Sequence, residues 1–204
     1  MFRNRWIRFL SGTNGKTLPS SVYFSALPVL ETPRLILRPL TRKDAKDIFS
    51  FASDPEVARY VLWEPHRSIA ETKAYIRYML DLYRRGLPAS WAVTLRESGR
   101  VIGTMGFMWF SEVNSSAEVG YSLCRSEWNR GLATEALRAV IDSAFASLSL
   151  NRLEAQHDTR NPASGRVMEK CGMYKEGVLR QRIRNKGELV DVALYAVLRS
   201  DLEP

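Results

Sequence analysis

The sequence is poor in the residues that build metal sites and disulfide frameworks. Its 204 residues include two cysteines, Cys124 and Cys171, and two histidines, His66 and His157. Neither cysteine lies in a C-x-x-C motif, and the histidines are far apart in the sequence. Such a composition offers few ligands for zinc and no disulfide scaffold. It predicts a reduced, cytoplasmic protein without a metal.

Long apolar runs are also missing, and so is a strong charge excess outside the N-terminus. No segment approaches the roughly 18 consecutive apolar residues that a membrane span needs. The net charge is +8, and residues 1–29 carry half of it, because they hold four basic residues and no acid. The rest of the chain is therefore only mildly basic. An acidic ligand or peptide fits this balance, and nucleic acid is not required.

The length and composition indicate one globular domain. A chain of 204 residues with 45% hydrophobic and 25% charged residues is long enough for one sizeable core and short for two. Residues 1–28 mix basic, aromatic and loop-forming residues and lack the apolar region of a secretory signal. We expect them to form an N-terminal extension that is mobile or loosely docked. Residues 29–204 are expected to form the domain.

Residues 117–148 carry the clearest pattern. Alternating apolar residues predict a strand over 118–123, and a stripe of helical period predicts a helix that begins at Gly131. The first amides of a helix have no partner within it, and the helix dipole attracts an anion such as a pyrophosphate. Gly131 would let a ligand approach the backbone, and Arg130 adds positive charge. Many α/β proteins use glycine here for steric reasons alone, so this stretch leaves both interpretations open.

The other segments predict a central mixed, mostly antiparallel sheet of about seven strands with helices on both faces. The helix that follows strand 118–123 makes a crossover, so the next strand should lie parallel to it. The predicted strands are 30–39, 90–95, 101–110, 116–123, 152–157, 174–183 and 188–198, and the predicted helices begin near Thr41, Pro55, Ser68, Gly131 and Asn161.

Four segments resemble the GNAT superfamily of acetyl-CoA-dependent N-acetyltransferases, and most closely its RimJ/RimL type, which acetylates protein N-termini. These segments are E-T-P-R-L-I-L-R-P, A-E-V-G-Y-S-L, W-N-R-G-L-A-T-E-A-L and N-P-A-S-G-R-V-M-E-K-C-G. The resemblance covers about residues 30–198. It implies a GNAT-like α/β (α+β) fold with a splayed parallel strand pair at the cofactor site, and acetyl-CoA as co-substrate.

The resemblance also implies roles for individual residues. The pyrophosphate would meet the amides of Arg130, Gly131, Leu132, Ala133 and Thr134, and the pantetheine arm would meet Leu123, Arg125 and Asn161. The acceptor pocket would be bordered by Trp63, Glu64 and His66. Two positions depart from the superfamily pattern. Trp128 replaces the usual Gln or Arg of the phosphate motif, and Met168 replaces the Tyr that often protonates the departing thiolate.

Two residues are the candidates for proton transfer. Glu118 enters an otherwise apolar strand and is the candidate general base, with Glu112 in reserve. Ser164 is the hydroxyl closest to the position of the missing Tyr. The alternatives are a structural ion pair between Glu118 and an arginine, and an ordinary first-turn helix serine.

The acceptor amine is the main open question. At pH 7 an α-amine with a pKa near 7.8 is roughly 15% neutral, whereas a lysine near 10.4 is roughly 0.04% neutral. A site with one carboxylate therefore favours the N-terminal α-amine of a protein or peptide. The alternatives are a small amine (an antibiotic, a polyamine or an amino acid) and a catalytically weak acyl-CoA-binding module. Nucleic-acid binding through the basic N-terminus is a remote fourth, and an oligomer is possible.

Overall fold

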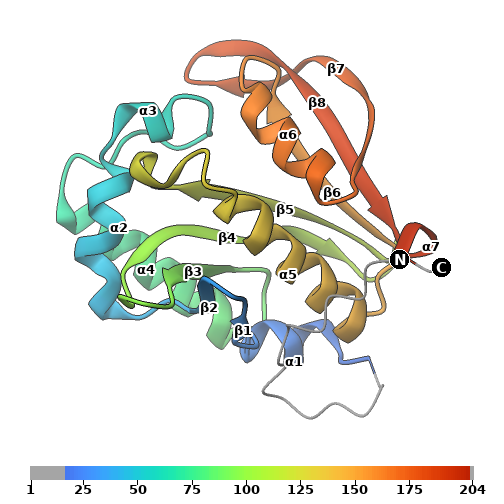
Figure 1. Cartoon of the computed structure of the whole chain (residues 1–204), viewed down its shortest axis with the longest axis horizontal. Coiled ribbons are helices and arrows are strands. Elements are labelled where there is room, and N and C mark those ends of the chain that lie inside the picture. The colour runs from blue at the N-terminus through green and yellow to red at the C-terminus, as the bar shows by residue number, and fades with distance from the viewer. Residues whose placement is uncertain (1–16, 203–204) are drawn as a thin grey trace.

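The computed structural model describes residues 17–202 and contains one eight-stranded sheet with the strand order β1-β2-β3-β4-β5-β6-β8-β7 (Figure 1). The strands are β1 Leu30–Glu31, β2 Leu35–Pro39, β3 Ser90–Leu95, β4 Val101–Ser111, β5 Ser116–Leu123, β6 Arg152–Asp158, β7 Tyr174–Asn185 and β8 Glu188–Leu198. The expected first strand is divided in two. Thr32 makes the turn, because its hydroxyl accepts from the amide of Leu35 at 3.0 Å.

Helices cover both faces of the sheet. In Figure 1, α5 and α6 lie on the side that faces the viewer, and α4 lies behind the sheet. The helices are α1 Ser20–Ser25, η1 Arg42–Asp44, α2 Ala45–Ala52, α3 Pro55–Ala58, α4 Ile69–Arg84, η2 Arg125–Glu127, α5 Leu132–Ser147, α6 Pro162–Lys170 and α7 Arg199–Leu202. No helix between residues 17 and 202 is both long and apolar enough to cross a membrane.

The sheet opens between β5 and β6, the only parallel neighbours among the described strands. Their pairing covers Ser116–Glu118 and Arg152–Glu154 alone. Beyond Glu118, β5 stays paired with β4, whereas β6 stays paired with β8. The predicted parallel pair is thus confirmed, and the two strands separate toward their carboxyl ends. The helices α5 and α6 begin at these ends, so both helix N-termini lie beside the gap.

The start of the described chain belongs to the core. Tyr23 and Phe24 in α1 are each 1% exposed, and the Tyr23 hydroxyl lies 2.9 Å from the hydroxyl of Ser143 in α5. The Phe24 ring packs edge-on against Phe107 and Phe110. The expectation of a loosely docked extension up to residue 28 is therefore wrong for residues 20–28. Residues 1–16 of that extension lie outside the described residues.

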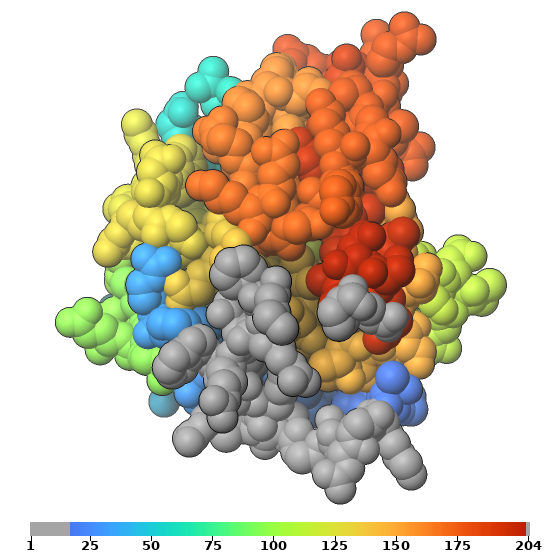
Figure 2. Space-filling model, turned by 45° about the vertical axis from the view of Figure 1, so that its right-hand side comes forward, coloured from blue at the N-terminus to red at the C-terminus, as the bar shows by residue number. Residues whose placement is uncertain are grey.

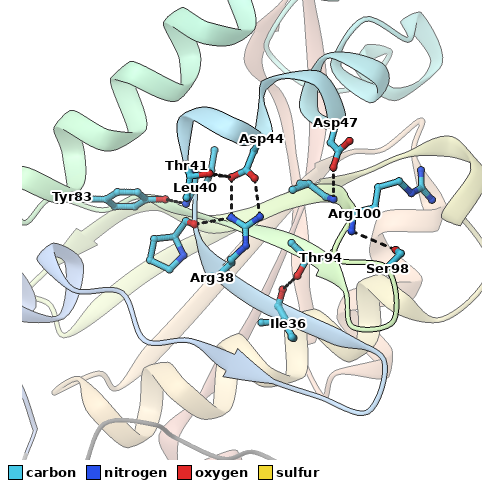
Figure 3. A network of polar contacts seen from close by, with 12 residues as sticks. Ile36, Arg38, Leu40, Thr41, Asp44, Asp47, Tyr83, Thr94, Ser98 and Arg100 are labelled. Atoms are coloured by element: carbon cyan, nitrogen blue, oxygen red, sulfur yellow. Dashed lines mark hydrogen bonds and ion pairs between the residues drawn. The ribbon is translucent and has the colours of Figure 1, made fainter.

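A polar network holds α2 against the edge of the sheet (Figure 3). The Arg38 guanidinium on β2 donates to both carboxylate oxygens of Asp44, at 2.8 and 2.7 Å. The amide of Thr41 also donates to Asp44, which completes a capping box at the start of η1. Nearby, the Tyr83 hydroxyl on α4 accepts from the amide of Leu40 at 3.1 Å. The network therefore ties two helices to β2.

Candidate active site

A cavity of about 450 Å³ lies where β5 and β6 separate. It extends from this gap to the loop between α3 and α4 and to the β7–β8 hairpin. Its walls are mostly apolar and aromatic. The polar or titratable side chains among them are Tyr60, His66, Tyr75, Tyr78, Ser90, Thr104, Glu118, Tyr121, Ser122, Gln156, His157, Asp158, Asn161, Ser164 and Asn185, together with the indole of Trp63. This distribution fits a site that offers apolar surface to a bound molecule and carries polar groups that can orient it.

Glu118 lines this cavity from the last position of β5 that pairs with β6. One carboxylate oxygen accepts from the indole N–H of Trp109 at 2.7 Å, and the other accepts from the amide of Gln156 at 3.0 Å. Glu118 makes no ion pair with any residue between 17 and 202, so the alternative of an arginine-paired carboxylate is wrong. Two neutral donors fix its orientation and leave further lone pairs free, as a proton acceptor requires.

Ser164 and Tyr121 form a hydroxyl pair across the gap. The Ser164 hydroxyl donates to the Tyr121 oxygen at 3.0 Å, and the Tyr121 hydroxyl donates to the backbone oxygen of Ser164 at 3.0 Å. Burial raises the pKa of Tyr121 far above its usual value, so the phenol keeps its proton. Met168 is 1% exposed in the adjacent turn of α6. Tyr121 thus brings a second hydroxyl to the cavity, from a strand rather than from the helix.

The N-terminus of α5 is free of its own capping side chain. Gly131 precedes the helix with a φ of +75°, a left-handed conformation that glycine adopts without strain. An added Cβ there would meet only the guanidinium of Arg34, at 3.6 Å. Gly131 is exposed, Leu132 is buried, and Ala133 and Thr134 are half-buried. Exposed backbone at a helix N-terminus fits the anion site that the sequence predicts.

Arg34 completes this end of α5, and the sequence patterns did not reveal it. Its Nε pairs with Glu135 at 2.7 Å, and its Nη1 donates to the carbonyl of Arg130 at 2.9 Å. Burial by itself would raise the pKa of Glu135, but hydrogen bonds from Thr32 and Arg34 outweigh it and hold that pKa below its usual value. Arg34 therefore neutralises an acid in the first turn that would repel a phosphate.

Comparison with known proteins identifies this arrangement. Residues 34–174 match the acetyltransferase (GNAT) domain family. The chain belongs to the GNAT acetyltransferases. It is 37% identical to the uncharacterized N-acetyltransferase YoaA of Bacillus subtilis over 172 residues, which cover 84% of this chain and 97% of that protein. A solved GNAT-family acetyltransferase from Bacillus anthracis matches with a TM-score of 0.76 at 26% identity, covering 86% of this chain and 99% of that one.

Family membership makes this GNAT chain an N-acetyltransferase with acetyl-CoA as its acetyl donor. An elongated, anionic thioester fits the gap between β5 and β6 and the uncapped N-terminus of α5. It also fits the arginine cluster formed by Arg34, Arg100 and Arg130. More distant relatives differ in their acceptors. One is the ribosomal-protein-serine acetyltransferase of Escherichia coli, at 28% identity over 64% of this chain and 72% of that protein. Another is its spermidine N(1)-acetyltransferase, at 26% over 70% and 74%.

Two residues that the resemblance assigned to acetyl-CoA, Arg130 and Leu123, have partners of their own in this GNAT fold. Arg130 pairs with the buried Glu127 at 2.5 Å, and Arg100 pairs with the same carboxylate at 2.6 Å. The indole of Trp128 donates to the carbonyl of Leu123 at 2.8 Å. Trp128 therefore packs against the carboxyl end of β5, and the Leu123 carbonyl already accepts a hydrogen bond from its indole. Two arginines share one glutamate, so the cluster keeps a net positive charge.

Two further residues expected at the pantetheine arm differ in their position. Asn161 lines the cavity, and its side chain does not cap α6. Arg125 is exposed at the start of η2 and is not among the cavity residues. Figure 2 shows the segments around these residues, in yellow and orange, side by side on one face of the molecule.

Of the three residues expected at the acceptor pocket, two line the cavity and one does not. Trp63 and His66 line the cavity, whereas Glu64 is exposed and outside its lining. His66 bonds through Nδ1 to the hydroxyl of Thr72 at 2.8 Å, and its ring lies 5.8 Å from Trp63 between ring centroids. Burial lowers the pKa of His66, so its imidazole is neutral at pH 7 and acts here as part of an aromatic wall.

The remaining reactive side chains do not form a separate centre. Burial raises the pKa of the Cys171 thiol to about 12, which leaves no nucleophilic thiolate at neutral pH. Within residues 17–202, no group of three or more His, Cys, Asp or Glu side chains could hold a metal ion. Glu118 and the Ser164–Tyr121 pair therefore remain the candidates for proton transfer in this cavity.

Proposed function

We propose that this enzyme acetylates the N-terminal α-amine of a protein or peptide, as members of the RimJ/RimL type do. The observation that carries the proposal is the small number of acids in the cavity. Among the described residues, only Glu118 and Asp158 contribute carboxylates to its lining, and Arg160 holds Asp158 in an ion pair at 2.7 Å. A polyamine carries several ammonium groups, and each needs a carboxylate or an equivalent partner when it leaves water. One free acid suits an acceptor with one amine.

The apolar and aromatic wall points to the same acceptor. It offers surface to the side chains of a peptide, while Glu118 and the hydroxyl pair offer polar contacts at a single place. The α-amine also needs less help than a lysine, because it loses its proton nearer to neutral pH. A single carboxylate is sufficient for it.

In this mechanism, bound acetyl-CoA supplies the acetyl group as a thioester. Glu118 accepts a proton from the amine, directly or through a water molecule, while Trp109 and Gln156 keep its carboxylate in place. The Ser164 hydroxyl, which rests as a donor to Tyr121, turns to give its proton to the leaving thiolate and then regains a proton from solvent. No covalent link to the protein is required, since holding both reactants in one cavity already lowers the entropic barrier.

The test is a competition within one molecule. A short peptide with a free α-amine and a free lysine is incubated with the enzyme and acetyl-CoA, and fragment mass spectrometry locates the label. Spermidine is assayed in parallel at equal concentration. We expect label on the α-amine and little turnover of spermidine. Label on lysine, or a higher kcat/KM for spermidine, would refute the proposal and assign the enzyme to side-chain or small amines.

A further inference from the structure

Met108 is an exposed apolar side chain in the cavity that holds the candidate base. It lies on β4, lines the cavity and is 59% exposed. Its neighbour Trp109 donates its indole N–H to Glu118. Methionine is flexible and polarizable, so its thioether adapts to the shape of an apolar group that packs against it. Single exposed apolar residues are common on protein surfaces, and what distinguishes Met108 is the way in which β4 and β5 place it.

A β-bulge sets the directions of Met108 and its neighbours. Phe107 on β4 pairs with Val119 on β5. Trp109 pairs with the preceding residue of β5, Glu118, so Met108 is the extra residue that has no partner on that strand. In a regular strand, residues 107 and 109 would point to the same face. Here Phe107 is buried in the core, whereas Trp109 reaches Glu118. The extra residue bends the strand and re-aims its side chains, as bulges beside active sites commonly do.

The Met108 thioether lies over Gly120 of β5. A Cβ added to Gly120 would meet the Met108 sulfur at 3.0 Å and its Cγ at 3.3 Å. Met108 therefore occupies the space that a side chain at position 120 would take. Glu118 and Gly120 both line the cavity and are two residues apart on one strand, so their side-chain directions share one face, about 7 Å apart. The thioether thus lies on the same face as the Glu118 carboxylate, roughly one side-chain row nearer to the carboxyl end of β5.

The position of Met108 suits a group next to the reacting amine. A general base must come within about 2.6–3.2 Å of the atom whose proton it takes, or act through one water molecule. The carbon that bears the amine is one bond further away, so its substituents can reach the neighbouring side-chain row. In a peptide, these substituents are the side chain of the first residue and the backbone carbonyl. The carbonyl is polar and loses free energy against a thioether, whereas an apolar side chain gains contact there.

We propose that Met108 determines acceptor specificity by forming the wall against which the side chain of the first acceptor residue packs. The thioether supplies apolar contact and limits the size of that side chain. The inference rests on the proposed function, because in a peptide with a free α-amine this side chain is the apolar substituent beside the amine. Met108 takes no part in proton transfer, and its effect on the reaction depends on the first residue of the acceptor.

The experiment combines substitutions at Met108 with peptides that differ only in their first residue, and it uses the full-length enzyme. The peptides carry Ala, Leu or Phe at that position, and release of free CoA thiol gives kcat/KM for each. Met108→Ala removes the thioether, whereas Met108→Leu keeps an apolar side chain of similar volume. Leu189→Ala is the matched control, because Leu189 is 49% exposed and is not among the cavity residues.

We expect the wild type to prefer the peptide that begins with Ala to the one that begins with Phe. Met108→Ala should raise the Phe-to-Ala ratio of kcat/KM by about 10-fold, the smaller effect of a methylene-sized change in an apolar pocket, and the Leu peptide should lie between. Met108→Leu and Leu189→Ala should keep the wild-type ratio. Because Met108 is largely exposed, the melting temperature and the KM for acetyl-CoA should stay the same in all variants.

Three results would overturn the inference. The first is a wild type that acetylates the Phe peptide as fast as the Ala peptide. The second is a Phe-to-Ala ratio that Met108→Ala leaves unchanged, or that Leu189→Ala changes to the same extent. The third is an equal loss for all three peptides together with a lower melting temperature, which would indicate a structural role. If the wild type binds acetyl-CoA but acetylates none of these α-amines, the proposed function fails and the inference fails with it, and this outcome is distinct from the other three.

Discussion

Glu118→Gln tests whether the carboxylate acts in the transition state or only helps to deprotonate the amine. Glutamine has the same size, and its amide oxygen can still accept from Trp109 at the 2.7 Å position, so the cavity should keep its shape. At pH 7 the α-amine is already roughly 15% neutral, so deprotonation alone can contribute at most about 7-fold. A general base in the transition state contributes about 10²- to 10⁴-fold. We expect kcat/KM to fall by this larger factor.

The assay is release of free CoA thiol with a peptide α-amine as acceptor, from pH 6 to 9.5. Glu112→Gln is the matched control, because Glu112 is an exposed acid whose carboxylate accepts from the hydroxyl of Ser20. The KM for acetyl-CoA should stay unchanged in both variants. A loss of 7-fold or less in Glu118→Gln, or a loss that disappears above pH 9, would refute a role for Glu118 in the transition state. Activity lost in Glu112→Gln instead would move the base to that residue.

Three further changes probe the rest of the protein. Phe24→Ala should lower the free energy of unfolding by about 3–5 kcal/mol in urea denaturation. The control is Val22→Ala on the same helix, where the side chain is 49% exposed and the change should be less than about 0.5 kcal/mol. A loss below about 1 kcal/mol in Phe24→Ala would contradict the tight docking of α1. Arg38→Met should cost about 1.5–3 kcal/mol at pH 7. Burial alone would raise the pKa of Asp44, but hydrogen bonds led by that from Arg38 hold it below its usual value. The stabilisation of the folded state by the Arg38–Asp44 pair is therefore present above about pH 4 and is lost as the pH falls through the lower, folded-state pKa. The difference between wild type and Arg38→Met should therefore narrow in acid, and a constant difference down to pH 2 would exclude this linkage. Gly131→Ala should cost about 1–2 kcal/mol of stability, because its φ is positive, and should raise the KM for acetyl-CoA; an unchanged KM would argue against an anion site at α5.

The sequence predicted the parts of the fold that depend on neighbouring residues. The apolar stripe of α5, the parallel pairing of β5 with β6 and the β7–β8 turn each follow from a local pattern, and the structure confirms all three. At the start of α4, only half of a capping box is formed. Ser68 accepts from the amide of Glu71, but the Glu71 carboxylate bonds to the amide of Arg67 instead of completing the box.

The parts that the sequence did not reveal depend on contacts between distant segments. Trp109 and Gln156 meet at Glu118 because three strands bring them into register, from positions 9 and 38 residues away. Tyr121 and Ser164 are 43 residues apart. No spacing rule connects such residues until the strand order is known. The six-residue α1 escaped for another reason, since it is too short to show a helical period.

The position of α1 has a consequence for synthesis on the ribosome. The hydroxyl of Tyr23 meets Ser143, and the amide of Leu18 donates to the carbonyl of Ser147 at 2.7 Å. These partners are made 120 and 129 residues later, which takes roughly 6 to 26 s at about 5–20 residues per second. Tyr23 and Phe24 therefore leave the ribosome long before α5 exists. The nascent chain carries two exposed aromatic rings through most of its translation, and the domain closes over them only after α5 has emerged.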